Sequence, residues 1–394
     1  MAIAKAVKEA LGSSSMIRKM FEEGSRLKRQ HGADRVFDFS IGNPDLEPPP
    51  AFHRVFNELA REDSPGSHGY MPNAGYPDVR AALAEKVSRE QGAALDASLI
   101  VMSVGAAGGL NAVFKAILNP GDEVVVSRPY FMEYRSYVSN HGGRLVEADS
   151  LPGFGLDPVA IEAAMTERTA AVLINSPHNP TGRVYPARTI AALADALRRQ
   201  GGKTGRFPYL VADEPYRELV YAAETPPVLS AYEESIVVSS YSKSLSLPGE
   251  RIGYIAVSPA VRDRDEVMEA LIYATRILGF VNAPALMQRI VARLTEERVA
   301  VEVYARRRDV FRRILDEAGI AYAEPEGAFY LFCRVPGSSG DDRAFVDLLK
   351  KHLILGVPGS SFRAPGWVRF AYCVDERIIA ASSAAFKAAM KEWS

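Results

Sequence analysis

The chain has 394 residues, 47% of them hydrophobic and 24% charged, and a formal net charge of −1. These values are typical of a globular protein long enough to bury one large core and a smaller one. The balanced charge and the scatter of basic residues among acidic ones argue against a nucleic-acid tract or a membrane-surface helix, so we expect small-molecule partners.

The N-terminal stretch MAIAKAVKEALGSSSMIRKMF has no continuous apolar core followed by a cleavage site. No stretch of the sequence approaches the ~20 apolar residues that span a bilayer. We expect an amphipathic helix or arm at this end. The two cysteines, Cys333 and Cys373, lack CxxC or CxxH spacing, which argues against a disulfide scaffold or a metal site. A cytoplasmic setting is the simplest one.

From about Asp96 to Pro259, short β-branched runs alternate with helical stretches. Near-continuous hydrophobic strands joined by helices predict a mostly parallel sheet that is covered on both faces. The strand runs are LIVMSV, EVVVS, AAVLIN, YLVAD, SIVVSS and IGYIAV, and the clearest helices are AGGLNAVFKAIL and PARTIAALADALRRQ.

From Pro284 to Ala318 the pattern becomes long, charged and helical, and the strand-like runs GAFYLFCRV and GWVRFAYC follow before a last helix. This change predicts a second, smaller α+β domain that is reached by a long helix. We expect a large domain at 43–285 and a small C-terminal domain at 286–394. The sequence alone does not settle where residues 1–42 pack, and we assign them to the small domain.

Two turns follow predicted strands in the large domain. In VGAAGGLNAVFKAIL, Gly105, Ala106 and Ala107 lie at a strand-to-helix junction, where small residues let backbone N–H groups and the helix dipole approach a phosphate. A purely structural turn is the alternative. In INSPHNPTGRVY, two prolines hold Asn179 in place, and its neutral amide suits a phenolate or carboxylate oxygen. A rigid surface turn is the alternative there.

The segment YLVADEPYRELVY places Asp213 at the end of an apolar run, with Tyr216 three residues later. A carboxylate at a semi-buried strand end needs a cationic partner, because an unpaired buried charge is costly. The protonated ring nitrogen of a pyridine cofactor is one such partner, and an arginine is the alternative.

The segment SSYSKSLSLPGERIGYIAV places Lys243 in a short Ser-rich loop after a predicted strand, where parallel strands open toward a ligand crevice. Arg251 follows eight residues later, so the sequence can aim an amine and a guanidinium at one cavity. A lysine whose pKa is lowered by burial or by a cationic neighbour is a nucleophile toward aldehydes. A solvated loop lysine beside a surface arginine is the alternative.

This ordered set of motifs resembles the class I/II aminotransferases, fold-type I enzymes that depend on pyridoxal 5′-phosphate (PLP). The resemblance extends over roughly Phe39 to Tyr372. It implies an α/β fold with a mostly parallel seven-stranded sheet flanked by helices, plus a smaller α+β domain. It also implies ping-pong transfer of an amino group from an L-amino acid to a 2-oxo acid.

By this resemblance, Lys243 is the Schiff-base lysine and also moves the substrate Cα proton, while Asp213 keeps the pyridine nitrogen of PLP protonated. Tyr216 and Asn179 hold the cofactor O3′ oxygen, and Asn179 also borders the substrate. The residues assigned to the cofactor phosphate are Gly105, Ala106, Ala107, Ser240 and Arg251.

Four further assignments follow from the resemblance. In RPYFMEY, Phe131 covers the cofactor face, with Tyr130 as the alternative. Arg369 in GWVRFAY clamps the substrate α-carboxylate, and Gly42 in FSIGNPDL lies where the backbone passes the substrate. Tyr70 in HGYMPNAGY reaches the phosphate of a neighbouring subunit, which implies a homodimer. Ordinary core, surface or loop placement is the alternative for each.

The sequence departs from the family pattern at the phosphate turn. Ala106 and Ala107 stand where some relatives place hydroxyl residues, so backbone amides must do more of the phosphate binding. His178 occupies a variable position of the NPTG loop, and we assign it no role.

Other reactions stay open at this level. A C–S β-lyase, an eliminase like aminocyclopropanecarboxylate synthase, or a decarboxylase can share every motif named above, because the fold does not fix the reaction. A PLP-binding regulator would need an added DNA-binding domain and a basic face, which this sequence lacks. Aspartate, aromatic, alanine-type and branched amino donors all remain open, and the family resemblance favours a dicarboxylic or an aromatic donor.

Overall fold

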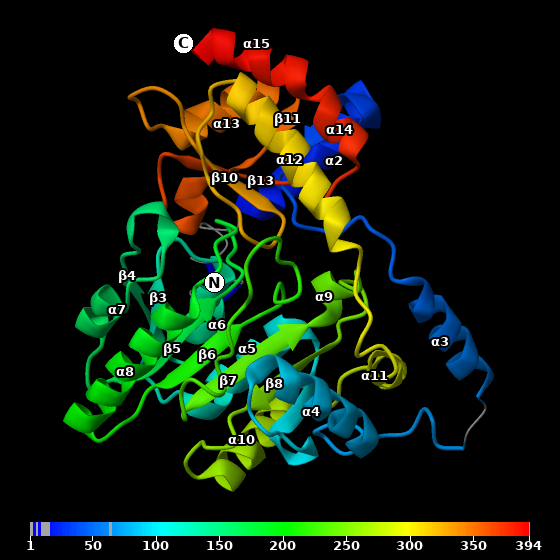
Figure 1. Ribbon diagram of the computed structural model, residues 1–394, viewed down its shortest axis with the longest axis vertical. Coiled ribbons are helices and arrows are strands. Elements are labelled where there is room, and N and C mark those ends of the chain that lie inside the picture. Colours follow the sequence, from blue (N-terminus) through cyan, green and yellow to red (C-terminus); the bar gives the residue numbers. More distant parts are fainter. Residues whose placement is uncertain (1–2, 5–6, 9–15, 63–64, 394) are drawn as a thin grey trace.

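The structure, a computed structural model, describes residues 3–4, 7–8, 16–62 and 65–393 (Figure 1). The helices of the described part are α2 (Met16–His31), α3 (Pro50–Arg61), α4 (Pro77–Gln91), α5 (Gly105–Ile117), α6 (Glu133–Ser139), α7 (Pro158–Ala164), α8 (Ala187–Thr204), α9 (Tyr241–Ser244), α10 (Arg264–Ile277), α11 (Ala285–Ala292), α12 (Val301–Glu317), α13 (Asp342–Lys351), α14 (Glu376–Ala381) and α15 (Ser383–Trp393). Short 3₁₀ turns are η1 (Ala33–Arg35), η2 (Ala97–Leu99), η3 (Pro152–Phe154) and η4 (Gly359–Phe362). The strands are β1 (Phe37–Asp38), β2 (Ile100–Ser103), β3 (Glu123–Ser127), β4 (Arg144–Ala148), β5 (Thr169–Asn175), β6 (Tyr209–Asp213), β7 (Ser235–Ser240), β8 (Gly253–Val257), β9 (Tyr322–Ala323), β10 (Tyr330–Arg334), β11 (Ile354–Leu355), β12 (Val357–Pro358) and β13 (Trp367–Ala371).

A seven-stranded sheet forms the centre of the larger part of the molecule, in the order β2-β8-β7-β6-β5-β3-β4. Strand β8 runs antiparallel to β2 and β7, and the remaining pairs are parallel. The predicted mostly parallel sheet and all six predicted strand runs are therefore confirmed. The seventh strand, β4, was not among the named runs, because it lies at the sheet edge and is only half-buried.

Both faces of this sheet are covered by helices, since strand residues alternate between two hydrophobic clusters. In β5, Val172 and Ile174 pack with α8 and α11, whereas Ala171 and Leu173 pack with α5 and α10 on the other face. A strand that is buried on both sides reads as a continuous apolar run, and this is why the sequence revealed it.

The C-terminal part is built on a smaller antiparallel sheet in the order β12-β13-β10-β9, which lies with α12 and α15 at the upper side of Figure 1. The single long helix predicted here is wrong, because the chain forms α11 and α12 with a break between them. Tertiary hydrogen bonds occupy the break: the Val299 N–H donates to the Ser244 carbonyl, and Lys86 Nζ donates to the Thr295 carbonyl.

The N-terminal segment joins this second part through β1, which pairs in parallel with β11. The expected N-terminal helix corresponds in part to α2, and most of the first fifteen residues lie outside the described ones. The boundaries at residues 42 and 285 stay predictions. Within the described ranges, no helix combines the length and the apolar character needed to cross a membrane.

Candidate active site

Three neighbouring parallel strands end in polar residues at one edge of the large sheet. Strands β5, β6 and β7 end at Asn175, Asp213 and Ser240, and Asn175 lies directly opposite Asp213 in the register. The carboxyl edge of a parallel sheet is where such folds place ligands. A cavity of about 320 Å³ opens there, and every predicted site residue except Gly105 and Tyr70 lines it.

Lys243 lies in the one-turn helix α9 rather than in the loop that the sequence predicted. Its Nζ donates a hydrogen bond of 2.6 Å to the Gly42 carbonyl and lies 5.4 Å from the centre of the Phe329 ring. Burial lowers the pKa of Lys243 to about 8, and the charges of Arg369 and Arg251 act in the same direction. The amine therefore has a sizeable neutral, nucleophilic fraction near neutral pH.

Asp213 is buried, and only one of its oxygens is occupied. Tyr134 Oη donates to Asp213 Oδ2 at 2.5 Å, while no hydrogen-bond partner for Oδ1 exists among the described residues. Burial raises the pKa of this carboxyl from 3.8 to about 7, against the opposing effect of the Tyr134 hydrogen bond. No arginine pairs with it in the described part of the chain, so the site lacks the cation that a buried carboxylate needs.

A chain of amides connects Asp213 to Arg369 on β13. Asn175 Nδ2 donates to the Asp213 carbonyl, and Asn175 Oδ1 accepts from the Asn179 N–H at 2.8 Å. Arg369 Nη1 then donates to Asn179 Oδ1 at 2.9 Å, and its Nη2 donates to the Ser40 carbonyl. The Arg369 Nε is buried and has no partner among the described residues, which leaves it available for an anion.

Tyr330 on β10 is a site residue that the sequence analysis missed. Its hydroxyl lies 2.7 Å from the Tyr216 hydroxyl, and the Arg369 guanidinium lies 4.5 Å from its ring centre. A Cβ on Gly42 would lie 2.0 Å from the Tyr330 oxygen, so the backbone passes this side chain as closely as glycine permits. The run GAFYLFCRV marked a strand, but nothing in it indicated which strand residue faces the cavity.

The phosphate candidates gather at the start of α5. Gly105 has φ +65°, and a Cβ there would lie 2.8 Å from an Arg251 guanidinium nitrogen. Gly105 thus lies directly against Arg251 although its own atoms do not line the cavity. Arg251 Nη1 also donates to the Pro248 carbonyl, and the buried Ser240 lies at the end of β7. The arrangement offers backbone N–H groups, a hydroxyl and a guanidinium to an anion.

Of the two candidate rings in RPYFMEY, Phe131 lines the cavity. Tyr130 is buried elsewhere and donates to Glu147 at 2.8 Å. Tyr134 in α6, three residues after Phe131, donates its hydrogen bond to Asp213 and was given no role from sequence. Its position three residues beyond Phe131 is the signal that could have found it.

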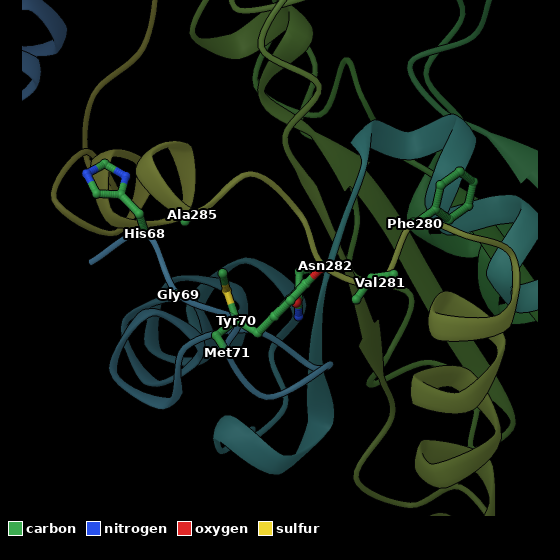
Figure 2. Close-up of a pocket in the computed structure, with 8 residues that line it drawn as sticks. All are labelled: His68, Gly69, Tyr70, Met71, Phe280, Val281, Asn282 and Ala285. Atoms are coloured by element: carbon green, nitrogen blue, oxygen red, sulfur yellow. The ribbon is translucent and has the colours of Figure 1, made fainter. Parts of the chain in front are cut away.

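Tyr70 lies outside the cavity and is 95% exposed. Figure 2 shows it on the 68–71 segment, beside the 280–285 segment, and the two segments line a separate pocket. Two side-chain amides tie them together: Asn73 donates to the Val281 carbonyl, and Asn282 donates to the Pro72 carbonyl. A large aromatic side chain is thus held out from the surface on an anchored turn.

The remaining residues noted in the sequence lie in structural positions. His178 is buried against Thr181, and burial lowers its pKa to about 3. Cys333 and Cys373 are free and buried. Among the described residues, no group of three or more histidine, cysteine or acidic side chains is arranged to hold a metal ion.

Comparison with known proteins places this site in a family. Residues 34–381 match the family described as aminotransferase class I and II. The aspartate/prephenate aminotransferase of Thermus thermophilus is 35% identical, with 88% of this chain and 89% of that protein covered. A solved aminotransferase structure from Eubacterium rectale superposes with a TM-score of 0.95 at 37% identity, over all of both chains.

The aspartate aminotransferase of Thermus thermophilus, solved with maleate, superposes with a TM-score of 0.87 at 30% identity, covering 99% of this chain and 100% of the other. The predicted fold class and the predicted aminotransferase activity are confirmed by these matches. The chain belongs to the class I and II aminotransferase family, and it has the fold of the aspartate aminotransferases.

Proposed function

We propose that this protein is a PLP-dependent aminotransferase that moves an amino group from an L-amino acid to a 2-oxo acid in two half-reactions at one site. The observation that carries the proposal is that Lys243 and Asp213, an amine of lowered pKa and a buried carboxylate of raised pKa, line the same cavity. Perturbed groups that converge in a cleft are typical of catalytic sites.

The residues present fit PLP. Within the described part of the chain the buried Asp213 Oδ1 has no partner, and a protonated pyridine nitrogen would supply a cationic one. PLP, when bound, contributes an aldehyde that condenses with amines and a ring that accepts electrons from the Cα–H bond. The residues that would hold its ring and O3′ oxygen are Phe131, Asn179, Asp213 and Tyr216, and those that would hold its phosphate are Gly105, Ala106, Ala107, Ser240 and Arg251.

Lys243 would act as the proton carrier at the substrate Cα. Its lowered pKa lets Nζ exist as the free amine, and the Gly42 carbonyl fixes the direction of that amine by accepting its hydrogen bond. The surrounding rings of Phe329 and Tyr216 keep water from competing for the proton.

Arg369 would orient the substrate by its α-carboxylate. Two of its nitrogens are fixed by Asn179 and Ser40, so the guanidinium is held in place before substrate arrives. Its unpartnered Nε, together with the remaining N–H groups, then suits a planar carboxylate. This contact would turn one substrate face toward Lys243.

The proposal also includes a homodimer and a cytoplasmic location. A homodimer is supported by the exposed Tyr70 on its anchored turn, from which the hydroxyl would reach the phosphate of a second subunit. The two free, buried cysteines are consistent with a reducing cytoplasm.

The proposal is tested with Lys243→Ala, with the exposed Lys203→Ala as the matched control. We expect the wild type and Lys203→Ala to show a visible absorbance band with PLP, and borohydride reduction should attach the cofactor to Lys243 in peptide maps. Lys243→Ala should lack the band and lose turnover by at least about 10²-fold.

Product analysis in the same assay separates the reaction types. Formation of a 2-oxo acid with the amino form of the cofactor supports transamination, whereas pyruvate and ammonia from a cysteine conjugate would indicate a lyase. A Lys243→Ala protein that keeps both band and turnover would overturn the assignment.

A further inference from the structure

The charges that line the active-site cavity are few. Within the part of the chain that the structure describes, the cationic side chains lining it are Lys243, Arg251 and Arg369, and the lining carboxylate is Asp213. The other lining residues are uncharged, and several are apolar or aromatic.

Each of the three cationic side chains is already held by a contact within the protein. Arg251 lies against Gly105 at the phosphate turn, and Lys243 is bonded to the Gly42 carbonyl. Arg369 is fixed by Asn179 and Ser40 with its Nε left for one carboxylate. A substrate that carries a second carboxylate would therefore find no free cation in this wall.

The side chain of a donor would instead meet uncharged groups. Ile41, beside Gly42, and Leu110 on α5 line the cavity, and so does the ring of Tyr137. The Tyr330 hydroxyl is engaged with Tyr216. We call Ile41, Leu110 and Tyr137 the uncharged wall. A carboxylate that loses water against such a wall without a cation pays a large desolvation penalty.

The surface around Tyr70, where the proposed second subunit would dock, also lacks fixed positive charge in the residues that line its pocket. The pocket around Tyr70 is lined by residues 68–71, 280–282 and 285, and among these described residues there is no lysine or arginine (Figure 2).

We propose that this enzyme takes amino donors with uncharged, apolar or aromatic side chains in preference to aspartate and glutamate. The inference rests on the proposed function and narrows its substrate class. It differs from what the name of the Thermus thermophilus relative suggests, since that protein is called an aspartate/prephenate aminotransferase. The inference rests on the charges that line this cavity, which the shared fold does not fix.

The first test follows the half-reaction with single amino acids. PLP-loaded protein is mixed at pH 8 and fixed ionic strength with leucine, methionine, phenylalanine, aspartate or glutamate, and the decay of the visible band is recorded. We expect second-order rate constants for the best uncharged donor to exceed those for aspartate and glutamate by at least about tenfold, because a buried unpaired charge costs that much or more.

An aspartate or glutamate rate equal to or above that of every uncharged donor would overturn the inference and leave the proposed function standing. If no amino acid changed the band, the proposed function itself would fail, and the inference with it. The two failures are therefore distinguishable in one panel.

The second test measures binding without turnover. Calorimetric titration compares 4-methylpentanoate, an uncharged-tail monocarboxylate, with maleate, the dicarboxylate bound by the Thermus thermophilus structure. We expect the wild type to favour 4-methylpentanoate. Ile41→Lys places a cation in the uncharged wall and should shift the affinity ratio toward maleate by about tenfold or more, whereas Ile41→Met should leave the ratio unchanged.

Ile41 is half-buried, and its backbone carbonyl accepts a hydrogen bond from the Cys373 thiol. Replacement of the Ile41 side chain by lysine or methionine leaves this backbone contact in place. Circular dichroism checks that each variant is folded. A wild type that prefers maleate, or a folded Ile41→Lys protein whose ratio does not move, would contradict the assignment of the uncharged wall to the donor side chain.

Discussion

Among single residues, Asp213 is a carboxyl whose ionised form is disfavoured by its own burial in the fold. Burial raises its pKa to about 7, and Tyr134 satisfies only one of its oxygens. The free protein therefore carries an electrostatic cost that a cationic ligand would remove. Such a cost, placed at one carboxylate, is typical of a site organised for binding rather than for stability.

We predict that Asp213→Asn stabilises the cofactor-free protein at high pH. Below the unfolded pKa of 3.8, the Asp213 carboxyl is protonated in both states and does not destabilise the fold. As pH rises the unfolded state ionises first, so the free energy of unfolding falls. The loss is complete above the folded pKa of about 7. Asparagine keeps an oxygen for Tyr134 and carries no charge. The thermal midpoint should exceed that of the wild type at pH 8.5, by an amount equivalent to a few kcal/mol at most, and the two should converge near pH 4.

The exposed Asp149, which lies outside the helices, gives the control, because Asp149→Asn should leave the midpoint nearly unchanged at both pH values. With PLP bound, the order should reverse, since the ionised carboxylate then gains its cation. Equal midpoints for the wild type and Asp213→Asn at pH 8.5 without cofactor would show that the buried carboxyl carries no penalty.

Tyr330 joins two groups that the sequence analysis treated separately. Its hydroxyl bonds to that of Tyr216, and its ring supports Arg369. Tyr330→Phe removes only the hydroxyl, so the ring contact with Arg369 stays. Tyr330 therefore acts as a positioning residue for the hydroxyl of Tyr216.

If Tyr216 donates to the cofactor O3′ oxygen as proposed, Tyr330→Phe should weaken that hydrogen bond, because linked hydroxyls polarise each other. That bond would favour the deprotonated cofactor, so the pKa read from the visible absorbance of the loaded protein should rise in the variant, by about one unit or less. Tyr322→Phe, whose hydroxyl contacts Arg312 and Asp316 outside the site, is the control. An unchanged titration in Tyr330→Phe would show that the pair does not act on the cofactor.

Among the helices and strands, the sequence predicted those that hydrophobic periodicity and turn-forming residues reveal. The strands that end at Asn175, Asp213 and Ser240 were readable because they are apolar and buried on both faces. The ordered motifs then indicated which side chains gather at the carboxyl edge. The edge strand β4 was not visible, because partial exposure dilutes its pattern.

What the sequence did not predict depends on tertiary contacts. The break between α11 and α12 follows from bonds to Ser244 and Lys86, residues far away along the chain. The turn α9 around Lys243 and the facing of Tyr330 toward Tyr216 have the same origin. Periodicity identifies a strand or a helix, but it does not tell which of its residues lies opposite a partner from another element.

At the junction of β2 and α5, Gly105 leaves no room for a side chain beside Arg251. Gly105→Ala adds a Cβ at φ +65°, 2.8 Å from the Arg251 guanidinium, so it strains the backbone and displaces Arg251 together. We expect the dissociation constant for PLP to rise by about tenfold or more, a change of ~1.4 kcal/mol, as measured by fluorescence titration. Gly202→Ala in α8, where a Cβ meets nothing within 4 Å, should bind PLP like the wild type. If Gly105→Ala bound PLP with wild-type affinity, the turn at Gly105 would not hold the cofactor phosphate.

At the scale of the whole molecule, the site of one chain is incomplete if Tyr70 belongs to it. The turn that carries Tyr70 is anchored by Asn73 and Asn282, yet the ring itself is exposed and does not line the cavity that holds Lys243. An anchored but exposed aromatic ring is typical of a surface that another molecule covers. In a two-fold dimer each subunit would give its Tyr70 to the other, and each site would need both chains.

Subunit complementation tests this arrangement directly. Lys243→Ala keeps Tyr70, and Tyr70→Ala keeps Lys243, so a mixed dimer has one site with both groups only if Tyr70 acts across the interface. After co-refolding of equal amounts, random pairing makes about half of the dimers mixed, and about one quarter of all sites should recover wild-type PLP affinity and turnover. Lys243→Ala mixed with the double variant Tyr70→Ala/Lys243→Ala provides the control and should recover nothing. If the first mixture shows only the average of its two parents, Tyr70 serves its own chain or no site at all, and the dimer would then rest on surfaces other than the turn at 68–71.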